Sequence, residues 1–249
     1  MTATPLVFRT MHDRWLSNSW LVADRPGGHA VVIDTGGPFE PIRARIADWR
    51  LTVTHVLLTH HHHDHVHHNA DYREHFACPC CGHGAERDLF GDLDTELTDG
   101  EEIHSGDLTI RALHIPGHTV GQLAFLVNER EVYTGDTLFR GSVGGTRAPG
   151  HGTLEQLRHS ICDVLLALPP ATVVRPGHMA ETTIAHELEH NPFVRHWRGL
   201  DAPLAKRVTA FGQPAELLVR ARDYDGGGKC LVRFDDGRHD TIPASRVTS

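Results

Sequence analysis

We predict from the sequence an α/β fold built of layers, followed by a small β-rich unit. Short apolar runs typical of strands recur through the first 200 residues, and segments with apolar residues at helical spacing lie between them. After about Leu200 the pattern changes to short strands separated by glycine-rich turns. We therefore expect two domains, a main domain over residues 1–200 and a β-rich unit over residues 201–249.

The first part of the main domain predicts several strands and a helix. Early strands are expected at residues 7–9, 20–23 and 29–34. A helix should follow, because Ile42, Ile46 and Trp49 recur at helical spacing. The β-branched run Val53–Thr59 predicts the next strand, which leads directly into a run of histidines.

The second part of the main domain repeats this alternation. Strands are expected at residues 108–115, 123–127, 131–134 and 172–175. Apolar residues at helical spacing predict a helix over Leu154–Leu168. Thr153 and Gln156 fit a capping box at the start of this helix, and the pair Pro169–Pro170 should end it.

The C-terminal residues predict a small antiparallel β unit that resembles an SH3-like barrel. Its strands are expected at residues 207–210, 215–222, 231–234 and 241–243. Turns are expected at residues 212–214, 225–228 and 235–237. Two roles stay open for this unit: a recognition module, or an accessory piece that packs on the main domain or on a second subunit of a homodimer.

Composition excludes several classes of partner. The formal net charge of −8 argues against a nonspecific grip on nucleic acid or on an anionic membrane. No stretch approaches the roughly 20 apolar residues of a membrane span, and the first ten residues lack the apolar core of a signal peptide. We therefore expect a cytoplasmic protein with no membrane or nucleic-acid partner.

The cysteines do not predict a disulfide framework or a soft metal site. Five cysteines are present, an odd number at uneven spacing. Cys78, Cys80 and Cys81 lie close together, but no second cysteine pair completes a tetrahedral site. We expect this segment to be a short apolar strand in which cysteine acts as a small hydrophobic residue.

The segment from Thr59 to His65 carries the strongest chemical signal in the chain. It has the pattern H-x-H-x-D-H, and imidazole and carboxylate groups are the preferred nitrogen and oxygen ligands of Zn²⁺ and similar ions. The Asp-His pair at its end fixes the register within the run of histidines. The predicted ligands are therefore His60, His62, Asp64 and His65.

Three other predicted strands are each followed by a further candidate ligand. His118, Asp136 and His178 lie just after the strands near residues 108–115, 131–134 and 172–175. Strand ends at one edge of a sheet converge, so loops there can direct side chains to a shared point. The pattern thus predicts one metal centre assembled from four segments.

Seven candidate ligands suffice for two divalent ions, most simply Zn²⁺, with Fe²⁺ or Mn²⁺ as alternatives. We assign His60, His62 and His118 to one ion, and Asp64, His65 and His178 to the other. The two oxygens of Asp136 can bridge them. Such a pair of ions lowers the pKa of bound water from 15.7 to about 7, which gives a hydroxide nucleophile at neutral pH.

These motifs resemble the metallo-β-lactamase superfamily, and most closely its hydroxyacylglutathione hydrolase (glyoxalase II)-like branch. The matching segments are residues 34–36, 59–65, 116–121, 134–139, 176–178, 181–184 and 191–193. The resemblance covers about residues 5–198 and implies an αββα sandwich with a dinuclear site at the sheet edges. It also implies hydrolysis of a thioester, with the ligand roles given above.

Three departures from the branch leave the thiol carrier of the substrate open. His67 and His68 stand where the branch has glycine, and we expect them at the rim of the site. Residues 144–147 replace a Gly-Arg-Thr-Asp type sequence, so an Arg-Asp pair near the site is lost or rearranged. The helical C-terminal domain that binds glutathione in the classical enzymes is absent. Glutathione, mycothiol, coenzyme A and a carrier-protein pantetheine arm all remain candidates.

The leading functional prediction is a metal-dependent hydrolase of a small-molecule thioester. Asp64 has a second candidate role as a proton shuttle to the thiolate leaving group. One alternative is a persulfide dioxygenase that uses a single Fe²⁺ held by His60, His62 or His118, and Asp136. Another is a non-catalytic binding module in which the metal only stabilises the fold. A β-lactamase and a nuclease are less favoured, because Asp136 stands where the commonest β-lactamases have cysteine and the chain is acidic.

Overall fold

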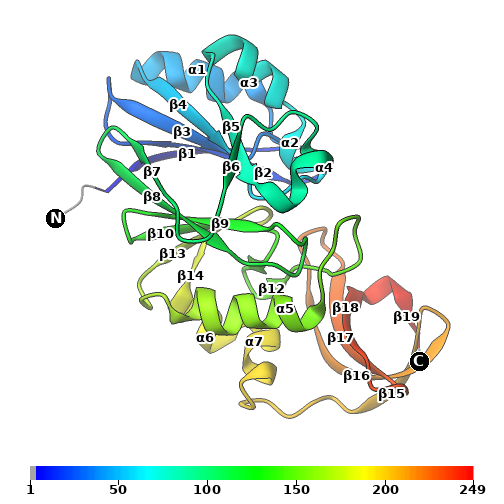
Figure 1. Cartoon of the computed structure of the whole chain (residues 1–249). Coiled ribbons are helices and arrows are strands. Elements are labelled where there is room, and N and C mark those ends of the chain that lie inside the picture. Colours follow the sequence, from blue (N-terminus) through cyan, green and yellow to red (C-terminus); the bar gives the residue numbers. More distant parts are fainter. Residues whose placement is uncertain (1–3, 249) are drawn as a thin grey trace.

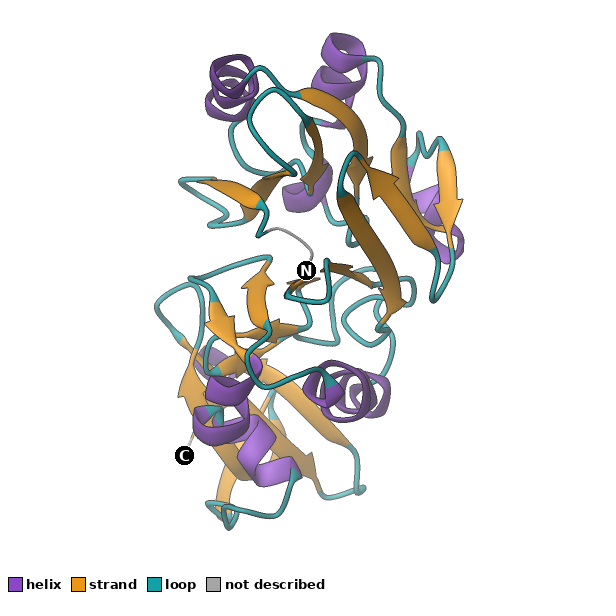
Figure 2. Cartoon of the chain, turned by 90° about the vertical axis from the view of Figure 1, so that its left-hand side faces the viewer, coloured by secondary structure: helices purple, strands orange, loops and turns teal. Residues whose placement is uncertain are grey.

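Two six-stranded sheets lie face to face in the computed structural model, which describes residues 4–248. Helices cover the outer side of each sheet, so the layers follow the order helix, sheet, sheet, helix (Figure 1). Figure 2 shows the same arrangement from the side. The layered α/β fold predicted from the sequence is therefore confirmed. The expected domain limits at residues 1–3 and 249 lie outside the described residues.

The first sheet has the strand order β1-β2-β3-β4-β5-β6. Its strands are β1 Leu6–Met11, β2 Asn18–Ala23, β3 His29–Ile33, β4 Thr52–Leu57, β5 Cys80–His83 and β6 Thr95–Leu97. The pairs from β3 to β6 are parallel, so the ends of these strands point to one edge of the sheet. Helices α1 and α3 cover its outer face, and they span Phe39–Trp49 and Asn69–Phe76. Three shorter segments are α2 His63–Val66, η1 Gly84–Glu86 and α4 Arg87–Phe90.

The second sheet has the strand order β14-β13-β10-β9-β8-β7. Its strands are β7 Glu102–Ser105, β8 Leu108–His114, β9 Leu123–Val127, β10 Glu131–Gly135, β13 Val173–Pro176 and β14 Thr182–Thr183. A two-stranded hairpin, β11 Leu138–Phe139 with β12 Ser142–Val143, follows β10. The outer face is covered by α5 Leu154–His159, α6 Ile184–His190 and α7 Pro192–Trp197.

The helix predicted over Leu154–Leu168 is present but not uniform. It begins with the predicted capping box between Thr153 and Gln156. After α5 it widens into the π-helical turn η2 over Ser160–Val164 and tightens into the 3₁₀ turn η3 over Leu165–Ala167. Apolar spacing predicts the buried face of a helix but does not distinguish these variants, which arise where local packing shifts the hydrogen bonds.

Apolar side chains from the facing sheets fill the space between them. Trp20, Val31 and Leu57 of the first sheet pack with Phe125 and Tyr133 of the second. These residues explain the near-continuous burial of the central strands, because both of their faces are covered. Cys80 and Cys81 are buried, free thiols in β5, which confirms the prediction that this segment is an apolar strand.

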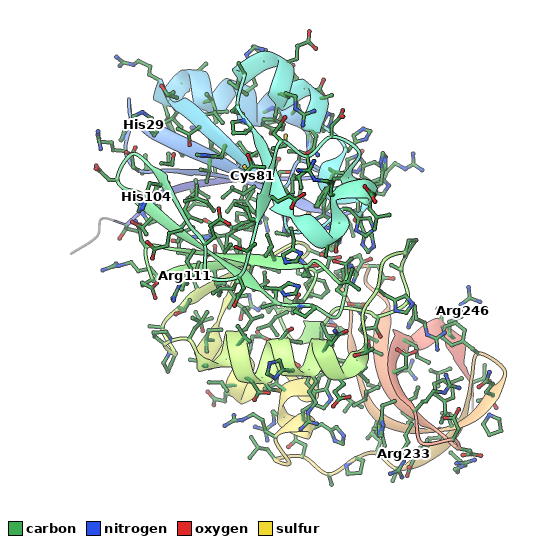
Figure 3. The ribbon with its side chains drawn as sticks, in the orientation of Figure 1. His29, Cys81, His104, Arg111, Arg233 and Arg246 are labelled. Atoms are coloured by element: carbon green, nitrogen blue, oxygen red, sulfur yellow. The ribbon has the colours of Figure 1, made fainter. Side chains whose placement is uncertain are left out.

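The C-terminal residues form a five-stranded antiparallel sheet with the order β18-β17-β16-β15-β19. Its strands are β15 Lys206–Ala210, β16 Gln213–Arg222, β17 Gly228–Phe234, β18 His239–Pro243 and β19 Val247–Thr248, with the short turn η4 Ala244–Arg246 before the last. We call these strands and their loops the C-terminal β unit; it includes Arg233 and Arg246 in Figure 3. The turn predicted at residues 212–214 is shorter than expected, because β16 already begins at Gln213.

The C-terminal β unit packs on the outer face of the second sheet and its helices. Leu218, Val219 and Leu231 belong to the same buried apolar cluster as Phe193 and Val194 of α7. A second, smaller cluster fills the unit itself. Among the described residues, no helix is long and apolar enough to cross a membrane.

Candidate metal centre

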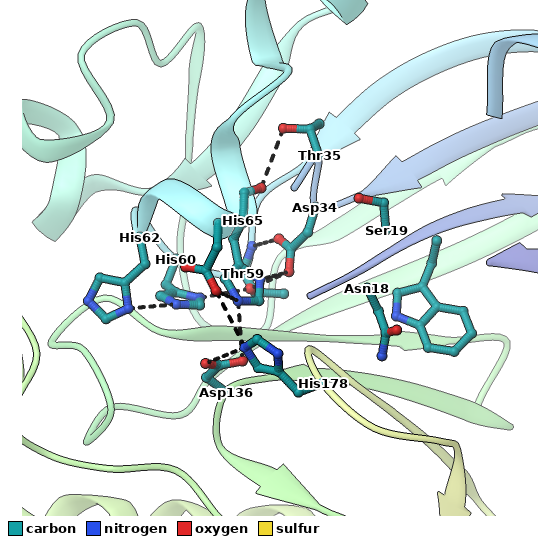
Figure 4. A network of polar contacts seen from close by, with 12 residues as sticks. Asn18, Ser19, Asp34, Thr35, Thr59, His60, His62, His65, Asp136 and His178 are labelled. Atoms are coloured by element: carbon teal, nitrogen blue, oxygen red, sulfur yellow. Dashed lines mark hydrogen bonds and ion pairs between the residues drawn. The ribbon is translucent and has the colours of Figure 1, made fainter. Parts of the chain in front are cut away.

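Four loops that follow strands meet at one edge of the two sheets. Figure 4 shows residues from three of them, with His60, His62 and His65 close to Asp136 and His178. His60 and His62 follow β4, and α2 then presents Asp64 and His65. The remaining three come from the second sheet, where they follow β8, β10 and β13: His118, Asp136 and His178. Strand β4 ends two residues before the predicted end at Thr59, because ladder pairing with β5 stops at Leu57.

His60, His62 and His118 form the first half of the cluster. The Nδ1 atom of His62 lies 3.0 Å from the Nε2 atom of His60. The same atom lies 3.0 Å from the Nε2 atom of His118. His60 and His118 are buried, whereas His62 is partly exposed.

Asp64, His65 and His178 form the second half, and Asp136 lies between the halves. The Nε2 atom of His178 lies 3.5 Å from the carboxylate of Asp64 and 3.3 Å from that of Asp136. Asp136 Oδ1 lies 3.3 Å from His65 Nε2, and Asp136 Oδ2 lies 3.6 Å from His118 Nε2. The structure therefore brings together all the side chains that we predicted as ligands.

Hydrogen bonds outside the cluster fix which ring nitrogen of His62, His65 and His118 faces inward. His62 Nε2 donates to the Pro149 carbonyl at 2.9 Å, and His118 Nδ1 donates to the Gly145 carbonyl at 2.7 Å. His65 Nδ1 donates to Asp34 Oδ2 at 2.9 Å. Because the outer nitrogen carries the proton, the inner nitrogen of each ring presents a lone pair.

Thr59 orients His60 in the same way. Its hydroxyl donates to Asp34 Oδ2 at 2.8 Å, so its oxygen accepts from His60 Nδ1 at 3.0 Å. The lone pairs of His60, His62 and His118 then face one another at hydrogen-bond distance with no proton between them. Such an arrangement is repulsive by itself and fits a site for a cation, because a metal ion satisfies all three.

Buried atoms without partners support the same interpretation for the second half. Within the described residues, His65 Nε2, Asp136 Oδ1 and both ring nitrogens of His178 have no hydrogen-bond partner. Buried polar atoms are normally satisfied, so a group of orphaned ligand atoms at one point indicates a missing positive partner. The donor set of histidine and aspartate suits a divalent ion.

Burial and neighbouring charges set the ionisation of the cluster. Burial lowers the pKa of His118 to about 4, which keeps its imidazole neutral and able to bind a metal. Burial alone would raise the pKa of Asp136, but His178 and His65 hold it well below its usual range. Burial would lower the pKa of His178, yet Asp136 and Asp64 raise it to about 9. The carboxylates thus create a negative field that favours any bound cation.

Two carboxylates around the cluster were not assigned these contacts by the sequence analysis. Asp34 is buried with φ 56°, and it accepts hydrogen bonds from the Thr59 backbone and side chain and from His65. Glu86 is fully buried and accepts from His61 and from the backbone of Gly121. Glu86 thereby ties the histidine segment to the loop that carries His118. No local motif marks Glu86, because its partners are distant in sequence.

The remaining histidines of this region do not join the cluster. His61 Nδ1 contacts Glu86 at 2.7 Å, and His63 is exposed. His67 is exposed beside Trp15, while His68 contacts Asp71 at 2.6 Å. Of the four consecutive histidines at positions 60–63, His60 and His62 therefore belong to the cluster and His61 and His63 do not.

Residues 144–147, which depart from the family sequence, contact the C-terminal β unit. Arg147 Nε donates to Asp240 of β18 at 2.6 Å. Thr146 donates to the same carboxylate at 3.0 Å, and Thr241 donates to the Gly144 carbonyl at 3.1 Å. The C-terminal β unit thus holds the loop whose Gly145 carbonyl orients His118.

The sequence and the fold both match a known family. The family model described as Metallo-beta-lactamase superfamily matches residues 12–178, which is more than half of the chain. The chain belongs to the metallo-β-lactamase superfamily. This membership confirms the resemblance found in the metal motifs, and with it the αββα sandwich.

Curated relatives match this chain over most of their own length. An uncharacterised protein of Mycobacterium tuberculosis is 36% identical over 207 residues, which cover 71% of this chain and 92% of the relative. The hydroxyacylglutathione hydrolase GloC of Haemophilus influenzae is 34% identical over 187 residues, which cover 67% of this chain and 87% of the relative.

Solved structures of superfamily proteins share the fold. BLEG-1 B3 metallo-β-lactamase has a TM-score of 0.70 at 30% identity, covering 76% of this chain and 99% of its own. ETHE1 from Myxococcus xanthus has a TM-score of 0.66 at 29% identity, and the match covers 77% of this chain and 85% of ETHE1. A di-iron-bound form of TTHA1623 has a TM-score of 0.64 at 32% identity, and the match covers 77% of this chain and 100% of TTHA1623.

Proposed function

We propose that this metallo-β-lactamase superfamily protein is a hydrolase of thioesters that works with two divalent metal ions. His60, His62 and His118 would hold one ion, and Asp64, His65 and His178 the other, with Asp136 between them. The observation that carries the proposal is the convergence at one point of inward-facing imidazole nitrogens and of buried ligand atoms that have no hydrogen-bond partner. Zinc suits these nitrogen and oxygen donors, with iron or manganese as alternatives.

Bound at this point, the ions would act as Lewis acids that lower the pKa of water and polarise the substrate carbonyl. The chain's own contribution is orientation. Thr59, Asp34 and the carbonyls of Pro149 and Gly145 hold four imidazoles in fixed tautomers. Preorganised groups of this kind need no rearrangement during the reaction.

The carboxylate of Asp64 is accessible enough to transfer a proton as well as to bind a metal. Its side chain is 28% exposed, against 9% for Asp136. Burial would raise the pKa of Asp64, but contacts with His178 and His65 lower it, so the carboxylate is ionised at neutral pH. We propose Asp64 first as a metal ligand and second as a carboxylate that moves a proton to the departing thiolate.

The hydroxyacylglutathione hydrolase of Haemophilus influenzae supports the thioester class, because hydroxyacylglutathione is a thioester. The thiol carrier is left open between glutathione, mycothiol, coenzyme A and a pantetheine arm. The C-terminal β unit packs beside the loop over residues 144–147 and differs from a glutathione-binding helical domain.

Elemental analysis and a thioester panel test this proposal. Protein purified without added metal should contain between one and two divalent ions per chain and release free thiol from at least one S-acyl substrate. His60→Ala should lose bound metal and turnover, while His63→Ala, an exposed neighbour outside the cluster, should keep both. A fully metal-loaded protein that cleaves no thioester in the panel would refute the thioester assignment.

A persulfide dioxygenase is the second candidate. His60, His118 and Asp136 meet closely enough to resemble the two-histidine, one-carboxylate site of mononuclear iron oxygenases. Oxygen uptake with glutathione persulfide by the iron-loaded protein would favour this function. Thiol release from a thioester without oxygen uptake would favour the hydrolase.

A further inference from the structure

His178 differs from the other histidines of the cluster in how it is held. His60, His62, His65 and His118 each have an outer ring nitrogen in contact with a protein oxygen. His178 Nδ1 is buried and has no hydrogen-bond partner among the described residues. A metal-binding histidine normally relies on such a bond to fix its ring orientation, so His178 needs another constraint.

Aromatic packing supplies that constraint. The ring of Tyr224 stacks on the imidazole of His178 with centroids 4.0 Å apart and an interplanar angle of 16°. Phe139 meets His178 edge-on, at 5.8 Å and 83°, and meets Tyr224 at 5.8 Å and 69°. The imidazole is therefore enclosed by two rings that allow one plane of orientation.

Tyr224 comes from the loop between β16 and β17, in the C-terminal β unit. Buried polar contacts anchor this loop beside the β11–β12 hairpin. Lys229 and Asp223 form an ion pair at 3.0 Å with both side chains less than 10% exposed. Lys229 Nζ also donates to the Val143 carbonyl at 2.6 Å, and Ser142 Oγ donates to Asp223 at 3.1 Å. The loop is thus fixed to the element that follows Asp136.

We propose that Tyr224 is a positioning residue of the second metal site, and that the C-terminal β unit thereby completes the metal centre. Its ring replaces the hydrogen bond that His178 lacks. This inference rests on the proposed dinuclear site and deepens it, because it assigns the second ion's affinity to a residue outside the superfamily motifs. The ring, and not the hydroxyl, carries the effect, so phenylalanine should substitute for tyrosine.

Metal binding measured independently of turnover tests the proposal. The full chain would be stripped with a chelator and titrated with Zn²⁺ against a competing chelator, and with Co²⁺ while its visible spectrum is recorded. Tyr224→Leu keeps an apolar side chain but removes the stacked ring, and Tyr224→Ala removes both. Tyr224→Phe keeps the ring without the hydroxyl and is the matched control. Circular dichroism of each variant verifies its fold, and the leucine variant serves if the alanine variant unfolds.

We expect Tyr224→Leu and Tyr224→Ala to bind the first ion as the wild type does and the second at least about tenfold more weakly. Their Co²⁺ spectra should change only in the second half of the titration, and Tyr224→Phe should match the wild type in both respects. Folded variants that bind the second ion as tightly as the wild type would overturn the inference alone. So would a Tyr224→Phe variant as weak as the leucine variant. A wild type that binds a single ion would overturn the dinuclear site as well.

Discussion

Gly177 lies at a point where the metal cluster leaves no room for a side chain. A Cβ atom there would lie 2.3 Å from Asp136 Oδ1 and 2.7 Å from the His65 ring. Gly177 directly precedes His178, and the Gly177 carbonyl accepts a hydrogen bond from the backbone N–H of Asn18 at 2.7 Å. The glycine of the Pro-Gly-His sequence is thus required by close approach, which is one of the uses of glycine that sequence alone does not reveal.

Gly177→Ala should displace Asp136 or His65 and weaken metal affinity by about tenfold or more. Gly145→Ala is the control, because a Cβ at Gly145 meets nothing within 4 Å although the residue belongs to the same site. Competition with a chelator measures both variants. Equal affinities of the two variants would contradict the steric argument.

The buried carboxylate of Glu86 should make the stability of the fold depend on pH. Burial would raise the pKa of Glu86, but hydrogen bonds from His61 and from the backbone of Gly121 lower it below its ordinary value of 4.5. A carboxyl group with a depressed pKa in the folded state stabilises the fold above the unfolded pKa and loses this contribution as the pH falls through the folded value.

The gap in unfolding free energy between the wild type and Glu86→Gln should therefore be largest near neutral pH and shrink below about pH 4.5. Urea unfolding of both proteins at pH 7 and pH 4, in the same chelator-containing buffer, measures the gap. A gap that is the same at both pH values would argue that the ionised carboxylate is not what stabilises this loop.

Among the elements, the loop between β16 and β17 and the β11–β12 hairpin depend on one buried ion pair. Lys229 lies between Asp223, the Val143 carbonyl and the ring of Phe139. Removing one member of a buried pair leaves the other charge without compensation, which is more costly than the pair is favourable.

Lys229→Met should lower the free energy of unfolding by about 3–5 kcal/mol. Lys206→Met, an exposed position in the same sheet, should change it by less than about 0.5 kcal/mol. Denaturant unfolding monitored by tryptophan fluorescence provides both values. A small effect of Lys229→Met would show that the pair does not anchor the loop.

The whole molecule is held together by a core that the two predicted domains share. Leu218, Val219 and Leu231 bury themselves against the helices of the second sheet, while hydrogen bonds from Thr146 and Thr241 join the C-terminal β unit to the metal site loop. The division into two domains at residue 200 stays a prediction. Because the two parts share this core, we expect the main domain to be less stable without the C-terminal β unit.

Deletion of residues 203–249 should expose the apolar side chains around Phe193 and Val194 and give an aggregating or partly unfolded product. Size-exclusion chromatography and circular dichroism of the shortened chain test this expectation. A monodisperse product with native-like spectra would instead support an independent main domain.

Metal removal should lower the stability of the whole chain, because only the folded state assembles the cluster from four loops. At a free metal concentration a hundred times the dissociation constant, binding adds about 2.7 kcal/mol to the unfolding free energy. Thermal unfolding with and without Zn²⁺ measures the gain. Asp136→Asn should lose most of it, whereas His114→Asn, outside the cluster, should keep it.

The sequence by itself determined the family, the layered fold and the positions of the side chains that gather at the site. It could do so because strand periodicity and ligand spacing are local properties: His60, Asp64 and His65 stand in one short segment, and the strand before each other ligand is visible in its apolar pattern. Helix and strand ends shifted by a few residues, since they depend on which neighbour supplies the next hydrogen bond.

Only the tertiary structure decided how the cluster is oriented and what encloses it. Asp34 contacts His65 across 31 positions of the sequence, and Tyr224 contacts His178 across 46 positions. Glu86 holds His61, beside the cluster, across 25 positions. Such contacts depend on how distant elements pack, which no local pattern encodes. The C-terminal β unit, whose place the sequence left open between two roles, therefore emerges as a neighbour of the metal centre through one stacked ring.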